Sequence, residues 1–296
     1  MRLLARKNLK KRAIEDEPAA VCQGCGHEAA GRYCPTCGED KLGKEDYSLR
    51  KYLGETLNIL TSVETNIFRS FASLVTRPGL LTAEYLGGKR KRYLKPLQLF
   101  LFCNIIFFFT QSTTGFKTLN TPLSTHLNLS YGGYARASVE RALREKRMTF
   151  EEYQIRFDAT IESQARTLVI VMVPLFALLM LALYRPQRRY FVEHLVFSTH
   201  FYSFFLLLMP AIFIFIFVAL KVARFFGHVP ALLSSDNFYG ILVLALCCLY
   251  LFPAMRRVYA QGRLTTLFKC ILLLTSLVFI LQTYRFILFF TTLYSI

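Results

Sequence analysis

Five long apolar stretches constrain the fold of this chain more than any other feature of its sequence. They run near residues 97–114, 166–184, 200–220, 237–255 and 266–292. A helix needs about 20 apolar residues to cross a bilayer core of about 30 Å. The chain is also 54% hydrophobic with a mean hydropathy of +0.36, more apolar than is usual for a soluble domain of this length. The sequence therefore predicts an all-α polytopic membrane protein with about five transmembrane helices.

The charged loops predict how these helices cross the membrane. Clusters of arginine follow the second and the fourth apolar stretch, at Arg185, Arg188 and Arg189 and at Arg256, Arg257 and Arg263. Short loops rich in Lys and Arg stay in the cytoplasm, and the first 21 residues lack the apolar core of a secretory signal. We therefore expect a multi-pass bacterial inner-membrane protein with a cytoplasmic N-terminus. Residues 115–165, whose charges are mixed, would form an extramembrane segment on the opposite side.

The region ahead of the first apolar stretch divides into three parts. Residues 1–21 form a charged tail that we expect to be mobile, and residues 22–40 contain a cysteine motif. Residues 41–96 are expected to form juxtamembrane helices, because 47–76 carry apolar residues at mostly helical spacing, which predicts an amphipathic helix. The Pro78-Gly79 pair interrupts this helix, and a short helix follows it.

The cysteine motif contains Cys22, Cys25, Cys34 and Cys37, arranged as two C-x2-C pairs eight residues apart. Each pair can direct two thiolates at one metal ion, and four thiolates complete a tetrahedral shell with no open position. This pattern predicts a zinc ribbon with one structural zinc ion. Two disulfides are the alternative, which a reducing cytoplasm disfavours. Because a ribbon this small has almost no core, metal binding would supply most of its folding free energy.

A basic cluster lies directly ahead of the first apolar stretch. Its members are Lys89, Arg90, Lys91, Arg92 and Lys95. At a membrane surface, each basic residue near anionic headgroups contributes on the order of 1 kcal/mol. We expect this cluster and the neighbouring amphipathic helix to bind the headgroups of membrane lipids and to hold the ribbon against the membrane.

The order of several short motifs resembles a known family. The residues that carry the likeness are Gly31-Arg32-Tyr33-Cys34, Cys37-Gly38-Glu39, Arg77-Pro78-Gly79, Tyr85, Gly88-Lys89-Arg90, Tyr93 and Pro96. Over about residues 22–110 this series resembles the bacterial domain-of-unknown-function family 3667. The resemblance implies an integral membrane protein with an N-terminal zinc-ribbon-like motif, and it implies no activity.

Polar residues inside the apolar stretches or near their ends are costly in a membrane and are therefore candidates for function. They are Asn104, Gln111, Glu193, His194, His200, Gln282 and Arg285. Arg285 could instead snorkel to the outer headgroups. The two histidines, six residues apart, fall on different faces of a helix and could simply occupy the interface.

Three functions of different classes remain open. The first is a non-enzymatic docking or sensing protein, with a possible protein partner at the ribbon. The second is a small transporter or channel, which predicts that Asn104, Gln282 and Arg285 face one another. The third, ranked last because no nucleophile elbow, P-loop or HExxH motif is present, is a membrane enzyme acting on a lipid-linked substrate. Nucleic acid is an unlikely partner, because Arg32 is the only Lys or Arg in the ribbon.

Overall fold

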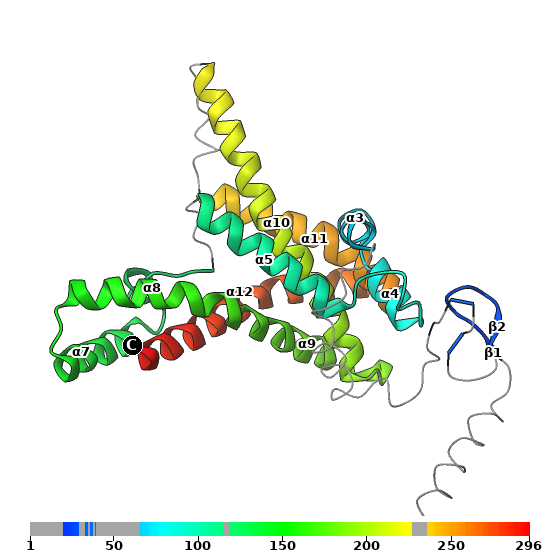
Figure 1. Ribbon diagram of the computed structural model, residues 1–296, viewed down its shortest axis with the longest axis horizontal. Coiled ribbons are helices and arrows are strands. Elements are labelled where there is room, and N and C mark those ends of the chain that lie inside the picture. Colours follow the sequence, from blue (N-terminus) through cyan, green and yellow to red (C-terminus); the bar gives the residue numbers. More distant parts are fainter. Residues whose placement is uncertain are drawn as a thin grey trace, which may run out of the picture.

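The computed structural model describes residues 20–29, 33–34, 36–37, 39, 66–114, 119–226 and 236–296. Within these residues, five helical segments are long and apolar enough to cross a membrane. They are α5 (Pro96–Thr114), α8 (Phe150–Leu168) continued by a 3₁₀ turn (Val169–Val171) into α9 (Met172–Leu183), α10 (Phe191–Phe225), α11 (Asp236–Tyr259) and α12 (Arg263–Ser295) (Figure 1). The predicted fold class is confirmed. Residues 1–19 of the predicted tail and residues 47–65 of the predicted amphipathic helix lie outside the described part.

Two of the helices are longer than the apolar stretches predicted within them. Helices α10 and α12 contain 35 and 33 residues, or about 50 Å at 1.5 Å per residue, whereas the bilayer core measures about 30 Å. At the start of α10, the Glu193 carboxylate accepts the N–H of Tyr190 and pairs with Arg189 at 3.1 Å. These contacts let α10 begin nine residues before the apolar stretch predicted near 200–220.

The charged segment ahead of α9 packs against the second half of α12. It contains α6 (Leu123–His126), α7 (Gly132–Lys146) and α8, which lie together at the left of Figure 1. Gln164 of α8 donates to the Ser295 hydroxyl at 2.7 Å and accepts from Thr292 at 3.1 Å. Helix α12 therefore joins the apolar bundle to this segment, which was predicted to be extramembrane.

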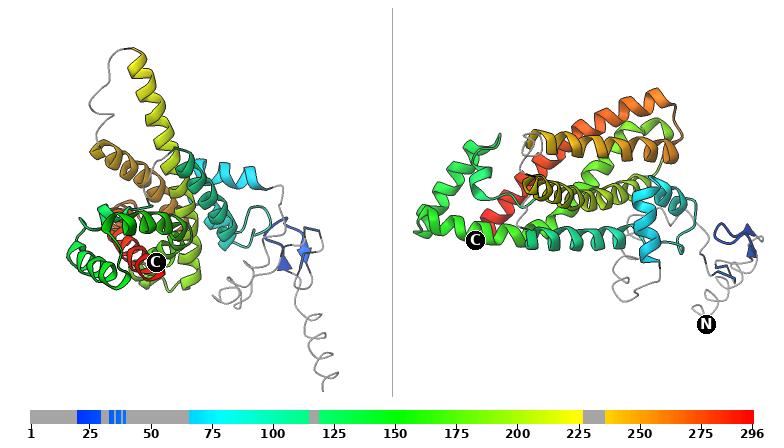
Figure 2. Two further views of the ribbon diagram at one scale, coloured as in Figure 1. Left: turned by 60° about the vertical axis from the view of Figure 1, so that its left-hand side comes forward. Right: turned by 90° about the horizontal axis from the view of Figure 1, so that it is seen from above.

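The basic loops gather at the other end of the bundle, where α3 (Ile67–Thr76) and α4 (Leu80–Leu86) also lie (Figures 1 and 2). Four side-chain donors tie the loops together by binding backbone carbonyls. These bonds run from Arg257 to Pro78 at 2.6 Å, from Gln187 to Tyr259 at 3.0 Å, from Arg189 to Val258 at 2.9 Å and from Lys269 to Leu183 at 2.9 Å. The loops predicted to share one side of the membrane thus form one connected end of the structure.

Gly79, the residue directly before α4, lies close to the backbone of α11 at this end. Its φ of +74° lies in the left-handed region, and a Cβ atom built on it would lie 2.8 Å from the Cα and the carbonyl oxygen of Ala254. Only glycine combines this backbone conformation with this clearance.

Candidate metal centre and its linker contact

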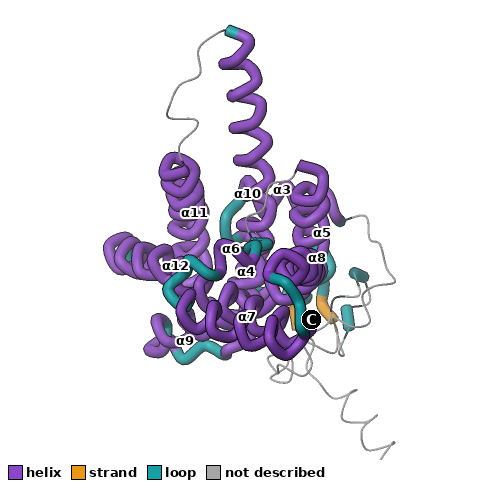
Figure 3. Tube along the Cα trace, turned by 90° about the vertical axis from the view of Figure 1, so that its left-hand side faces the viewer, coloured by secondary structure: helices purple, strands orange, loops and turns teal. Residues whose placement is uncertain are grey.

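The first cysteine pair lies in a turn between two short strands. β1 (Ala20–Val21) pairs antiparallel with β2 (Glu28–Ala29), and the strands lie at the periphery of the helices (Figures 2 and 3). In the turn, the N–H of Cys22 binds the carbonyl of His27 at 2.8 Å, and the N–H of Gly26 binds the carbonyl of Cys22 at 2.9 Å. Gly26, with a φ of +79°, supplies the left-handed residue that this turn needs.

The four thiols converge as the spacing of the two pairs predicts. The sulfur atoms of Cys22 and Cys37 lie 3.5 Å apart, as do those of Cys25 and Cys34, and all four lie within 4.8 Å of one another. Tetrahedral thiolates at the usual zinc–sulfur distance of 2.3 Å would be about 3.8 Å apart. The cluster therefore has the size of a single tetrahedral metal site.

The electrostatics of the cluster also suit a cation. The backbone N–H of Cys37 lowers the pKa of the Cys34 thiol to about 6, against desolvation. Although the N–H of Glu39 lowers the pKa of Cys37, burial and the neighbouring sulfur atoms raise it to about 12. One thiolate therefore forms easily and opposes ionisation of the next, a repulsion that a bound divalent cation would offset.

Glu39 connects the ribbon to the basic linker. Its side chain is only 6% exposed, and its two carboxylate oxygens accept the backbone N–H groups of Arg90 at 2.8 Å and Lys91 at 3.2 Å. Its own carbonyl accepts the N–H of Cys34 at 2.8 Å. One residue thus contacts both the cysteine cluster and the linker. Glu39 is one of the residues that carry the family resemblance, but no local pattern in the sequence identifies its hydrogen-bond partners.

Some side chains of the basic cluster contact residues of α4, and some are exposed to solvent. Lys89 and Arg92 lie 3.7 and 3.9 Å from the carboxylate of Glu84, and the Arg90 guanidinium lies 4.9 Å from the centre of the Tyr85 ring. The side chains of Lys91 and Arg92 are exposed. Part of the cluster therefore shapes the linker, and part remains open to a negatively charged surface.

The two histidines of α10 are buried among different helices. His194 is hydrogen-bonded to the Tyr259 hydroxyl at 2.8 Å, and His200 to the Thr82 hydroxyl at 2.9 Å. Tyr259 also stacks on Tyr184, with ring centres 3.9 Å apart. As their spacing predicts, the two histidines lie on different faces of α10. Each of them links α10 to a different neighbouring helix.

The remaining polar candidates lie in separate surroundings. Asn104 donates to the carbonyl of Arg166 at 2.9 Å, and the side-chain amide nitrogen of Gln111 is buried. Arg285 lies near Tyr131, and burial, followed by the Arg285 charge, lowers the pKa of His126 to about 4. In the described part of the chain, the contacts of Asn104 and those of Arg285 thus involve different elements.

One comparison with known proteins covers the linker and the helices around it. Residues 64–108 match the model of a family described as "Protein of unknown function (DUF3667)". No curated protein and no solved structure gives a significant match. The matched region includes α3, α4, the linker that receives Glu39 and the first part of α5, and it begins after the cysteine cluster. Residues 64–108 of this chain are therefore similar to the DUF3667 family.

Proposed function

We propose that this protein is a non-enzymatic docking or sensing protein anchored in the bacterial inner membrane, with a structural zinc ribbon in the cytoplasm. The contact of Glu39 with the N–H groups of Arg90 and Lys91 carries this proposal. Through this contact, the position of the linker depends on the folded state of the ribbon. The ribbon in turn depends on its metal, because it has little core of its own. Zinc is the metal proposed, since four thiolates in a tetrahedron favour it.

An exposed apolar face of α3 supports the placement of this helix on the membrane surface. Phe68, Ala72 and Val75 lie at helical spacing on this face, with Arg69 beside them, and Phe68 is 87% exposed. A helix with an apolar face and nearby basic residues binds at the level of anionic headgroups. We propose that this face and the exposed Lys91 and Arg92 rest on the inner leaflet, where the ribbon is presented to a protein partner.

A tryptophan at position 68 tests the location of this face. The chain contains no tryptophan, so the Phe68→Trp variant carries a single reporter. In lipid vesicles its emission should be shifted to the blue and quenched by brominated phospholipids, because the headgroup region excludes much of the water around the ring. Tyr134→Trp is the matched control, since Tyr134 is exposed on α7 at the other end of the structure. If both variants emit as in water and neither is quenched, α3 does not lie on the membrane.

Changing Glu39 to glutamine tests the coupling between ribbon and linker. The amide presents only one acceptor oxygen to the two N–H groups, so one charge-assisted hydrogen bond is lost. This loss costs about 1.5 kcal/mol, which raises the population of molecules with the linker detached from the ribbon about tenfold. Trypsin should therefore cleave after Lys91 or Arg92 about ten times faster, measured by mass spectrometry of the fragments. Zinc content should not change, since no cysteine is altered.

Glu28→Gln is the control for this experiment, because Glu28 is an exposed carboxylate in the same ribbon. It should leave the cleavage rate at the wild-type value. Equal rates in wild type and Glu39→Gln would contradict the proposed coupling.

The other two classes of function receive less support. A transport path would need Asn104 and Arg285 to share a lining, and their contacts lie with different elements. An enzyme using His194 and His200 would need exposed rings, and both are buried in hydrogen bonds that join helices.

A further inference from the structure

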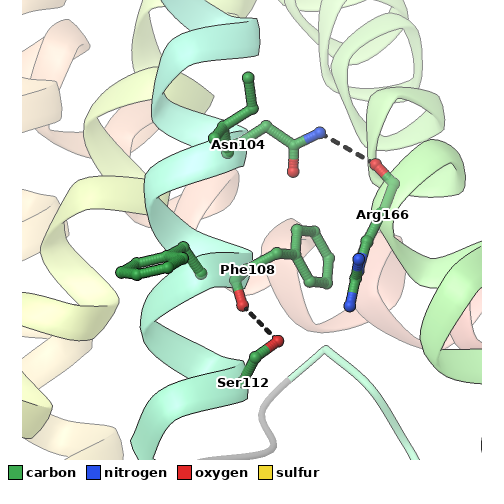
Figure 4. Close-up of a pocket in the computed structure, with 6 residues that line it drawn as sticks. Asn104, Phe108, Ser112 and Arg166 are labelled. Carbon is green, nitrogen blue, oxygen red and sulfur yellow. Dashed lines mark hydrogen bonds between the residues drawn. The ribbon is translucent and has the colours of Figure 1, made fainter.

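A cavity lies between α5 and α8, apart from the cysteine cluster and the basic linker. Its volume is about 290 Å³, close to the lower limit for small-molecule sites, about 300 Å³. Asn104, Ile105, Phe108, Phe109, Ser112 and Arg166 line it. Five of these residues belong to α5, and Arg166 reaches the cavity from the facing helix (Figure 4).

The cavity is bordered by a hydrogen-bond acceptor and by a cationic group. Asn104 donates its Nδ2–H to the carbonyl of Arg166 at 2.9 Å, which holds the two helices together. Its Oδ1 atom is buried and has no hydrogen-bond partner among the described residues. The Arg166 side chain extends along the cavity toward Ser112 (Figure 4). A buried acceptor and a guanidinium therefore border one space, which suits a ligand that has both a donor and an anionic group.

The position of Arg166 along its helix places the cavity where polar and apolar surroundings meet. Arg166 is the last charged residue before an apolar run that continues through α9. On the facing helix, Ile105 and Phe109 are 66% and 69% exposed. Large exposed apolar side chains on a candidate span face lipid. The cavity thus has an exposed apolar wall beside a cationic group, at the boundary between the charged and the apolar part of the α8–α9 segment.

Among the described residues, the carboxylate paired with Arg166 is that of Glu162, and it does not block an incoming anion. Glu162 lies 3.2 Å from Nη2 of Arg166, and both side chains are partly exposed to solvent. Exposed pairs of this kind, four residues apart on a helix, are weak. A phosphate can engage a guanidinium through two parallel hydrogen bonds, whereas one contact, from Nη2 of Arg166 to Oε1 of Glu162, joins this pair.

We propose that this cavity binds a glycerophospholipid. The phosphate binds the Arg166 guanidinium, and an ammonium or hydroxyl group of the headgroup donates to Asn104 Oδ1. One acyl chain lies along Ile105 and Phe109. This site lies apart from the basic linker, and the proposal does not depend on the ribbon.

Native mass spectrometry of the full chain in detergent tests this site, with phosphatidylethanolamine, phosphatidylglycerol and phosphatidylcholine as separate probes. The first two should remain bound to the wild type, and Arg166→Gln should lower their occupancy about tenfold. Phosphatidylcholine should bind more weakly, because choline has no hydrogen-bond donor for Asn104. Glu162→Gln should raise occupancy, since it removes the competing carboxylate.

The matched control is Arg156→Gln, an exposed arginine on the same helix outside the cavity. It should bind the lipids as the wild type does. Thermal unfolding of each variant without added lipid separates loss of the site from loss of the fold, because Arg166→Gln should unfold at the wild-type temperature. Equal lipid occupancy in wild type and Arg166→Gln overturns the proposal. Displacement of the lipid by inorganic phosphate at the same concentration also overturns it, because the site would then recognise an anion alone.

Discussion

Replacing Cys34 and Cys37 with serine is expected to abolish zinc binding, from about one ion per chain to none. The change removes half of the four-sulfur cluster, and two cysteines cannot complete a tetrahedral shell. Because the metal supplies most of the folding free energy of such a ribbon, the ribbon should unfold locally. Elemental analysis of the detergent-solubilised protein measures the zinc, and trypsin cleavage after Lys91 should accelerate in the same sample.

Cys247 and Cys248 provide the control for this variant. Both lie in α11, among the helices of the bundle, and the double serine variant should keep its zinc. Wild-type protein without zinc, or a Cys34 and Cys37 variant that retains it, would contradict the proposed metal site.

Gly79→Ala is expected to destabilise the helical bundle by about 2–5 kcal/mol. An alanine in the left-handed region costs about 1–2 kcal/mol, and forcing a Cβ against packed backbone typically costs about 1–3 kcal/mol more. The Cβ would lie 2.8 Å from Ala254 of α11, so α4 or α11 must shift. The shift would also strain the bond between Arg257 and the carbonyl of Pro78. The thermal unfolding midpoint of the detergent-solubilised protein measures this effect.

Gly133→Ala is the matched control, because a Cβ there would meet no atom within 4 Å. Its free energy of unfolding should stay within about 0.5 kcal/mol of the wild type. If Gly79→Ala were equally well tolerated, the close approach between α4 and α11 would not limit stability.

The parts of the fold that could be predicted from sequence depend on local patterns. Apolar length indicated five spans, and the spacing of Cys22, Cys25, Cys34 and Cys37 indicated that their thiols converge. Both signals are contained within one helix or one short loop. Their physical basis is lipid solvation in the first case and metal coordination in the second.

The parts that could not be predicted depend on which helices pack together. Thr82 and His200 are 118 residues apart, Asn104 and Arg166 are 62 apart, and Glu39 and Arg90 are 51 apart. No residue type or spacing in a single sequence specifies such pairs. Helix length was also underestimated for α10, because hydropathy marks only the apolar part, whereas Glu193 and His194 continue the helix through contacts with Arg189 and Tyr259.

The packing of α12 on the charged segment affects how the protein is made. Every residue of α6, α7 and α8 leaves the ribosome before Arg263, the first residue of α12. The bond between Gln164 and Ser295 spans 131 residues of chain, and the rings of His126 and Phe157 pack on Phe289, with centres 5.3 and 5.6 Å apart. During synthesis these apolar faces have no partner, a state that is prone to misassembly. The charged segment can therefore complete its fold only after α12 has been inserted into the membrane.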